Sequence, residues 1–189
     1  MPERRLILAS GSPRRRELLA RMGYTFETCS PDVDERIEGR ADEVARLLAV
    51  RKARAAAAGY RDAIIIASDT LVSLGGAALG KPVDHADARR MLRALSGREH
   101  EVFTGVCMID TKTGIEDAHV ARTGVAFRAL TDDEIDAYVE SGEPMDKAGA
   151  YGIQGGAGAF VTRLDGTYEN VMGFPVDLVA EMLAARMEG

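Results

Sequence analysis

The hydrophobic residues of this chain occur in short blocks separated by polar turns, and several blocks are typical of β-strands. Arg5–Ala9 (RLILA) and Phe26–Ser30 predict two short strands. The block Ala63–Ala67 (AIIIA) is apolar on both faces, which indicates a central strand covered by helices on each side. Further strands are expected in a hairpin over Leu71–Leu79, in a long hairpin over residues 99–128, and in GAGAFVTRL at 156–164.

Other apolar residues recur every three or four positions and predict amphipathic helices. The longest is expected from about Asp42 to Ala58, with Leu47 on its apolar face. Asp84 is a typical helix N-cap, and Thr131–Glu134 has the sequence of a capping box. A last amphipathic helix is expected from Pro175 to Arg186.

Strands and helices mix along the whole chain, without a linker, a repeat or a low-complexity tract. We therefore expect residues 1–189 to form a single α/β domain on a mixed sheet, because hairpins interrupt the βαβ units. The chain is 46% hydrophobic and 29% charged, as is ordinary for a globular protein. Its net charge of −6 argues against a general nucleic-acid or membrane-surface binder, so an anionic ligand would need a local basic pocket.

The cysteines, the histidines and the lack of targeting signals further restrict the class of protein and the kinds of site to expect. Cys29 and Cys107 lack C-x-x-C spacing and are expected to be reduced, buried thiols. The histidines at 85, 100 and 119 are too scattered for a metal site. There is no signal-peptide pattern, and no apolar run approaches the roughly 20 residues of a membrane span. These features predict a cytoplasmic protein without a membrane or nucleic-acid partner.

The segment SGSPRRRELL places three arginines at the start of a predicted helix. Ser12 is expected at the N-cap and Pro13 at the first helical position, so Arg14, Arg15 and Arg16 fall in the first turn. Cations there face the positive end of the helix dipole, at a cost of about 0.3–1 kcal/mol each. The arrangement therefore predicts a bound anion.

Two familiar nucleotide-binding motifs are matched only in part. GGAALGKP satisfies G-x-x-x-x-G-K from Gly75 to Lys81, but Pro82 replaces the Ser or Thr that would bind magnesium and disfavours a helix at Lys81. GIQGGAGAF offers Gly156-x-Gly158 without a third glycine or a following helix pattern. Neither a P-loop nor a dinucleotide-binding fold is expected.

Polar residues after the central strand form a second group of candidates. Ser68–Thr70 (SDT) is expected to end that strand, at the carboxyl edge where α/β proteins usually bind ligands. Taken alone, Asp69 equally fits a turn cap, and Lys52 and Lys81 fit ordinary surface lysines. The acidic connection PDVDERIEGRADE alone fits a solvated loop, and it carries Asp32, Asp34 and Glu35.

Taken in order along the chain, these segments resemble the Maf family of nucleotide pyrophosphatases. The resemblance runs from end to end through ASGSPRRRELL, VDE, RKA, ASDT, GKP, LSG, TGV, DKAGAYGIQGGAG and NVMGFP. It implies an architecture shared with the inosine-triphosphate pyrophosphatases, with two lobes around a central cleft, and often a homodimer. The implied reaction is hydrolysis of a nucleoside triphosphate between its α- and β-phosphates, which gives the monophosphate and pyrophosphate.

The resemblance also implies a role for each residue that matches a family motif. Glu35 and Asp69 would bind a divalent cation, Mg²⁺ or Mn²⁺, since such hard ions prefer oxygen ligands. Asp69 would also accept a proton from the attacking water. The residues implied to bind the triphosphate are Ser10, Arg14, Arg15, Lys52 and Lys81.

Three positions bear on substrate choice within the family. Arg14, Thr70 and Gln154 match the type that acts on dTTP and UTP, whereas the 7-methyl-GTP type has a bulky aromatic residue, Gln and Glu there. Two alternatives stay open from sequence: a 7-methyl-GTP pyrophosphatase, and a regulator of septum formation that binds nucleotide without hydrolysing it. The presence of Asp69, Glu35 and both lysines favours an enzyme.

Overall fold

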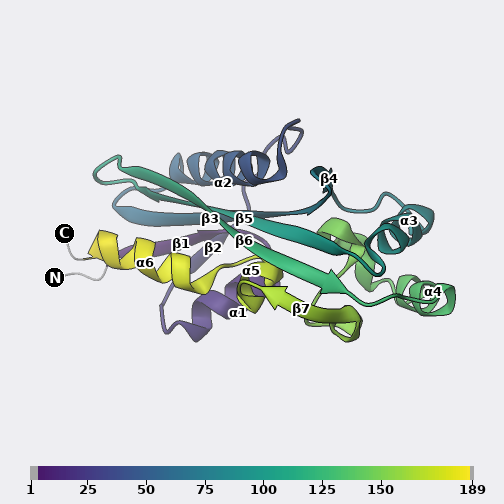
Figure 1. Ribbon diagram of the computed structural model, residues 1–189. Coiled ribbons are helices and arrows are strands. Elements are labelled where there is room, and N and C mark those ends of the chain that lie inside the picture. Colours follow the sequence, from purple (N-terminus) through teal and green to yellow (C-terminus); the bar gives the residue numbers. More distant parts are fainter. Residues whose placement is uncertain (1–3, 188–189) are drawn as a thin grey trace.

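The structure, a computed structural model, describes residues 4–187 and is built on one seven-stranded sheet with the order β2-β1-β3-β5-β6-β7 (Figure 1). Its strands are β1 (Arg5–Ala9), β2 (Glu27–Cys29), β3 (Ala63–Leu74), β4 (Ala77–Leu79), β5 (Glu99–Asp110), β6 (Glu116–Phe127) and β7 (Val161–Asp165). β1 is parallel to both β2 and β3, and the remaining pairs, including β3 with β4, are antiparallel. The predicted α/β class with a mixed sheet is confirmed.

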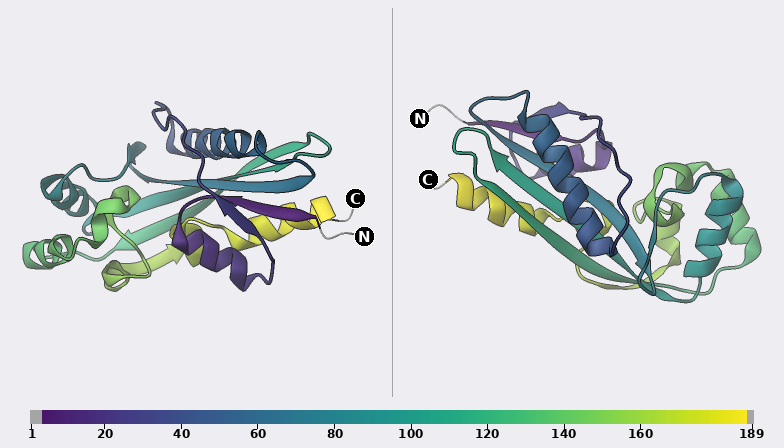
Figure 2. Two further views of the ribbon diagram at one scale, coloured as in Figure 1. Left: turned by 180° about the vertical axis from the view of Figure 1, so that it is seen from behind. Right: turned by 90° about the horizontal axis from the view of Figure 1, so that it is seen from above.

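Helices cover both faces of the sheet and one of its ends. They are α1 (Pro13–Arg21), α2 (Ala41–Ala57), α3 (His85–Leu95), α4 (Asp132–Glu140), α5 (Tyr168–Met172) and α6 (Val176–Met187), with 3₁₀ segments η1 (Glu143–Asp146), η2 (Ala148–Ala150) and η3 (Gly156–Phe160). α2 lies on one face, α1 and α6 lie on the other, and α3 and α4 lie at the far end of the long strands (Figures 1 and 2). Within residues 4–187, no helix is both long and apolar enough to cross a membrane.

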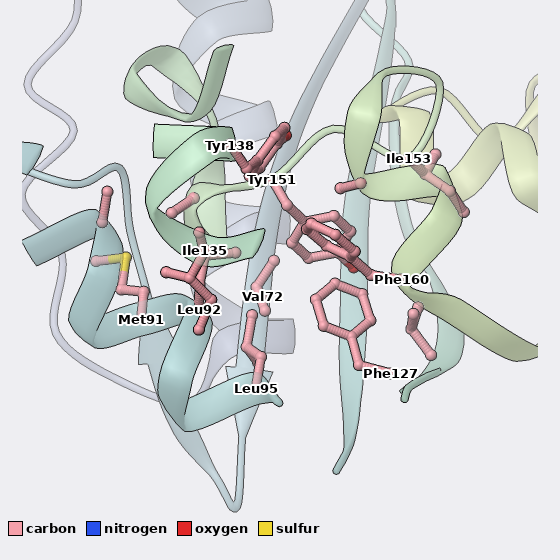
Figure 3. Packing of buried hydrophobic residues seen from close by; sticks show 14 of the residues in the cluster. Val72, Met91, Leu92, Leu95, Phe127, Ile135, Tyr138, Tyr151, Ile153 and Phe160 are labelled. Atoms are coloured by element: carbon pink, nitrogen blue, oxygen red, sulfur yellow. The ribbon is translucent and has the colours of Figure 1, made fainter. Parts of the chain in front are cut away.

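The apolar core is divided between two lobes, as expected. In the larger lobe, one cluster packs under α2 and includes Ile65, Ala67 and Cys107. A second cluster packs under α1 and α6 and includes Leu8, Ile66 and Phe174. The smaller lobe, formed by α3, α4 and the 3₁₀ segments on the ends of β3, β5 and β6, has its own cluster (Figure 3). In that cluster Leu92 of α3 and Ile135 of α4 pack toward Val72 of β3.

The capping signals that the sequence predicted for α3 and α4 are confirmed. Asp84 accepts a hydrogen bond from the Asp87 N–H at the start of α3. At α4, Thr131 and Glu134 exchange side-chain and backbone hydrogen bonds as a complete capping box. Such signals depend only on neighbours in sequence, so they are readable without the fold.

The predicted end of the central strand is wrong. Ser68–Thr70 lie in the middle of β3, which continues to Leu74 because β5 pairs with it from Ile64 to Ser73. Asp69 is therefore a strand residue and not a turn cap. The hairpin expected over Leu71–Leu79 is present as the end of β3, a turn, and β4.

Two further expectations also fail. Leu47 is 40% exposed, because α2 turns small residues toward the sheet, with Ala45, Ala49 and Ala53 completely buried. In the segment 156–164 the strand begins only at Val161, and the glycine-rich part before it forms the 3₁₀ segment η3.

Candidate active site

A cleft of about 670 Å³ opens where β1 ends and β3 continues past it. β1 pairs with β3 only as far as Leu8, opposite Ile66, and the chain then turns from β1 into α1. The polar end of the cleft is thus the carboxyl end of a parallel strand followed by the amino end of a helix, a usual place for ligands in α/β proteins. A cleft of this size is ample for a nucleotide-sized ligand.

Eight of the nine residues predicted for the site line this cleft. They are Ser10, Arg14, Arg15, Glu35, Lys52, Asp69, Thr70 and Lys81. The ninth, Gln154, is exposed on the turn that follows Ile153 and is absent from the lining residues. A role for Gln154 in base recognition requires this turn to move inward, so that role stays a prediction.

The start of α1 is open to an anion. Ser12 occupies the predicted N-cap position, but its side chain makes no capping hydrogen bond, and the first turn holds no acidic residue. The Ser12 N–H donates to the Ser10 hydroxyl at 3.1 Å. The backbone N–H groups of the first turn are therefore not capped by a side chain, and they stay available to an anion.

Arg15 is fixed by three hydrogen bonds across the cleft. Its guanidinium donates to the Gly173 carbonyl at 2.9 Å, to the Thr70 hydroxyl at 3.2 Å and to the Ser10 hydroxyl at 3.3 Å. Burial lowers the pKa of Arg15, while the nearby Asp69 opposes that shift, and the group stays a cation because guanidinium is so basic. Thr70, predicted to govern specificity, thus contacts Arg15 directly.

Two residues behind Arg15 were not found from the sequence. The Thr104 hydroxyl lies 3.0 Å from that of Thr70 and donates to the Asn170 carbonyl at 3.0 Å. Gly173 has φ +101°, and a Cβ there would lie 3.0 Å from the Thr70 hydroxyl. Both residues lie in segments that carry the family resemblance, TGV and NVMGFP, but only the tertiary structure shows that they contact the surroundings of Arg15.

Lys52 joins the two carboxylates that were predicted to bind metal. Its ammonium donates a hydrogen bond to Asp69 and lies 2.8 Å from the Glu35 carboxylate. Lys52 and Asp69 are largely buried, whereas the Glu35 side chain is 55% exposed. The ion pair with Lys52 lowers the pKa of Glu35, so this carboxylate is ionised at neutral pH.

The donor set suits a cation that is shared with a phosphorylated ligand. Residues 4–187 contain no group of three or more His, Cys, Asp or Glu side chains placed to hold a metal ion. Two carboxylates are too few for a site made of protein alone. They match the usual binding of Mg²⁺, which takes one or two carboxylates together with phosphate oxygens.

The small-lobe wall of the cleft was missed by the sequence reasoning. Asp146, Lys147, Ala148 and Tyr151 line it. The Lys147 ammonium donates to the Glu143 carbonyl at 2.6 Å and to the Asp146 carboxylate at 2.7 Å. These residues lie in the block DKAGAYGIQGGAG, whose sequence offered no local sign of which side chains face a ligand.

A comparison with protein families assigns the chain. A family model described as Maf-like protein matches residues 5–186. The chain belongs to the Maf family. Among relatives of this Maf protein, one from Moorella thermoacetica named dTTP/UTP pyrophosphatase is 51% identical, over 95% of this chain and 94% of the relative. Relatives with the same name from Bdellovibrio bacteriovorus and Vibrio cholerae are 46% and 50% identical, over 95% and 91% of this chain and 97% and 92% of each relative.

A solved structure is also similar to this Maf protein. It is that of a HAM1 protein from Coxiella burnetii, with a TM-score of 0.49 and 18% sequence identity, over 97% of this chain and 100% of that chain. The assignment to the Maf family rests on the sequence matches.

Proposed function

We propose that this Maf protein hydrolyses dTTP and UTP to the monophosphate and pyrophosphate. One observation carries the proposal: the start of α1, Arg15, Lys52 and Lys81 converge on one cleft that also holds the Asp69 carboxylate. Relatives named dTTP/UTP pyrophosphatase, at about 50% identity over nearly the whole chain, support the choice of substrate.

The cleft suits a triphosphate because donors and cations surround its polar end. Arg14 and the uncapped backbone N–H groups of α1 would bind phosphate oxygens. Arg15, whose guanidinium is oriented by Thr70 and Gly173, would bind them as well. The negative charges of the ligand would offset the conflict between the arginines and the helix dipole. Lys81 would add a further cation from the segment after β4.

Asp69 is the group we assign to proton transfer. It is 9% exposed and its carboxylate is oriented by Lys52, so it would accept a proton from a water molecule directed at the α-phosphorus. A carboxylate is a modest base, so the reaction would depend chiefly on positioning and on neutralising charge, which Lys52 and the arginines supply.

Glu35 and Asp69 would hold Mg²⁺ or Mn²⁺ together with phosphate oxygens. When bound, such an ion lowers the pKa of a water molecule and neutralises charge on the phosphates. Lys52 pairs with both carboxylates, so its ammonium compensates one of their two negative charges and leaves one for a cation to neutralise. We further propose the cytoplasmic location that the sequence features predict and the homodimeric state that the family resemblance implies.

The deciding experiment is release of pyrophosphate across a panel of nucleotides. The panel contains dTTP, UTP, CTP and 7-methyl-GTP, each with Mg²⁺, with Mn²⁺ and with chelator, and Asp69→Asn serves as the inactive control. We expect the highest kcat/KM for dTTP and UTP, loss of activity with chelator, and the monophosphate as second product. Preference for 7-methyl-GTP would support that alternative, and tight binding without turnover would support the regulator.

A further inference from the structure

Lys147 is a cation of the cleft for which the proposed reaction gives no role. Its side chain comes from the small lobe, between η1 and η2, and is only 14% exposed. Within residues 4–187 its ammonium bonds to the Glu143 carbonyl and the Asp146 carboxylate. An ammonium has three N–H donors, so one remains to bind a ligand in the cleft.

The aliphatic part of the Lys147 side chain packs against Gly152, which also lies close to the Arg14 guanidinium. A Cβ on Gly152 would lie 2.7 Å from Cε and 2.9 Å from Cδ of Lys147, so a side chain there would displace the lysine. The same Cβ would lie 3.4 Å from Nη1 of Arg14. The absence of a side chain at Gly152 thus leaves room for one cation from each lobe.

The backbone after Lys147 is held in an unusual conformation. Gly149 has φ 68°, and a Cβ there would lie 2.9 Å from the Val72 side chain. Ala150 is fully buried with φ 61°, in the left-handed region that residues with a side chain rarely adopt. The Gly149 N–H donates to the Gly80 carbonyl at 3.0 Å, which ties this segment to the residue before Lys81. Strain of this kind is typical of sites whose geometry matters for a ligand.

The surroundings of Lys147 differ from those of Lys52. Val72, Ala148 and Tyr151 line its part of the cleft, whereas Ser10, Lys52 and Asp69 line the polar end at the α1 start and α2. A planar base needs apolar contact together with a few polar groups that identify its edge. A triphosphate bound at the α1 end would therefore present its nucleoside to the wall that carries Lys147.

We propose that Lys147 binds the nucleobase and donates a hydrogen bond to O4 of uracil or thymine. The inference rests on the proposed function and specifies how the base is chosen. Thymine and uracil both carry the acceptor O4, whereas cytosine carries an amino donor at the same position. Because an ammonium can only donate, cytosine would place two donors against each other. A mismatch of this kind lowers kcat/KM by roughly 10- to 100-fold.

The test compares UTP with CTP in Lys147→Met, Lys147→Arg and the wild type. We expect Lys147→Met to reduce the ratio of kcat/KM for UTP over CTP by at least about tenfold, because the donor is lost. Lys147→Arg keeps a donor and should keep the preference within about threefold. Inhibition by inorganic pyrophosphate should stay within about twofold in both variants, since the start of α1, Lys52 and Lys81 still bind phosphate. Lys112→Met, at an exposed lysine in the β5–β6 turn, is the matched control.

Two results would overturn the inference. An unchanged ratio in Lys147→Met shows that the ammonium does not read the base. Equal losses for UTP and pyrophosphate show that it binds phosphate instead. If the wild type releases no pyrophosphate from any nucleotide, the proposed function fails, and calorimetric binding of UTP and CTP to the same variants then decides the role of Lys147 by itself.

Discussion

Gly105 lies directly opposite Asp69 in the antiparallel pairing of β5 with β3, and the backbone of α2 rests on it. A Cβ at position 105 would lie 2.3 Å from the Ala45 carbonyl oxygen and 2.5 Å from its carbon. Lys52 follows Ala45 by two helical turns and lies on the same side of α2. The missing side chain thus lets α2 approach closely enough for Lys52 to reach Asp69.

Gly105→Ala should lower activity by moving this helix. The added methyl group meets backbone atoms that cannot rotate away, so α2 must shift and Lys52 must move from Asp69. We expect kcat/KM for dTTP to fall by at least about tenfold at a temperature where the variant is folded. Cys107→Ala, at the next position on the same face of β5, loosens the packing against α2 without pushing the helix and should keep most activity. Equal losses in the two variants, matched for stability, would contradict this account.

Asp69→Asn should abolish turnover and leave binding largely intact. Asn keeps the shape but cannot accept the proton and is a poorer ligand for a cation, so kcat should fall by about 10²- to 10⁴-fold or more. Binding of dTTP, measured by calorimetry, should stay within about tenfold. Asp136→Asn, at a carboxylate of α4 that pairs with Arg89 outside the cleft, is the control and should keep wild-type activity. More than about a tenth of wild-type activity in Asp69→Asn would mean that Asp69 is structural.

The three arginines of α1 should separate into three behaviours. Arg14→Ala and Arg15→Ala should both raise KM and weaken inhibition by pyrophosphate, because both cations line the cleft where we place the triphosphate. Arg15→Ala should also lower the melting temperature, since it leaves the Gly173 carbonyl and the Thr70 hydroxyl without this donor. Arg14→Ala should not, because Arg14 opposes the helix dipole in the free protein. Arg16 is exposed, and its alanine variant should match the wild type. Identical behaviour of all three would indicate only a diffuse positive field.

Gln154→Glu tests whether the exposed turn closes on the base. A Gln side chain offers a donor and an acceptor to a uracil or thymine edge, whereas Glu offers acceptors and a negative charge. We expect kcat/KM for dTTP and UTP to fall by at least about tenfold, with pyrophosphate inhibition nearly unchanged. The exposed position of Gln154 makes the result informative. An unchanged dTTP rate would show that the turn stays away from the base.

His100 should make stability depend on pH. The ring is 3% exposed, it bonds to the Tyr151 hydroxyl at 2.7 Å, and burial lowers its pKa to about 4. Above about pH 6.5 the ring is neutral in both folded and unfolded states and adds no pH dependence. As the pH falls from 6.5 toward 4, only the unfolded state takes up the proton, so the free energy of unfolding decreases by up to roughly 3 kcal/mol.

His100→Gln removes the titrating ring and keeps a polar partner for Tyr151. Denaturant unfolding at pH 7 and pH 4.5 should therefore show a smaller loss of stability in this variant than in the wild type, by roughly 2–3 kcal/mol. His85→Gln, at a half-exposed histidine on α3, should lose as much as the wild type. Equal losses in His100→Gln and the wild type would mean that the buried ring is not the group that titrates.

The sequence by itself determined the features that depend on neighbours along the chain. Pro13 after Ser12 marks the start of α1, and Thr131 with Glu134 marks the start of α4, because capping involves residues only a few positions apart. The three arginines in the first turn of α1 indicated an anion from the sequence alone, since a helix dipole has the same sign in every fold.

Tertiary structure alone decided the features that depend on distant segments. SDT looked like the end of a strand until pairing with β5 carried β3 on to Leu74. Local sequence does not show why position 105 must be glycine, because the requirement comes from close packing of Ala45, 60 residues earlier in the chain, against it. Lys147 looks like any surface lysine in sequence, and it lines the cleft because Gly152 leaves room for its side chain and the Gly149 N–H bonds to the Gly80 carbonyl. Residues that meet across a fold obey packing and pairing geometry, which no spacing along one chain encodes.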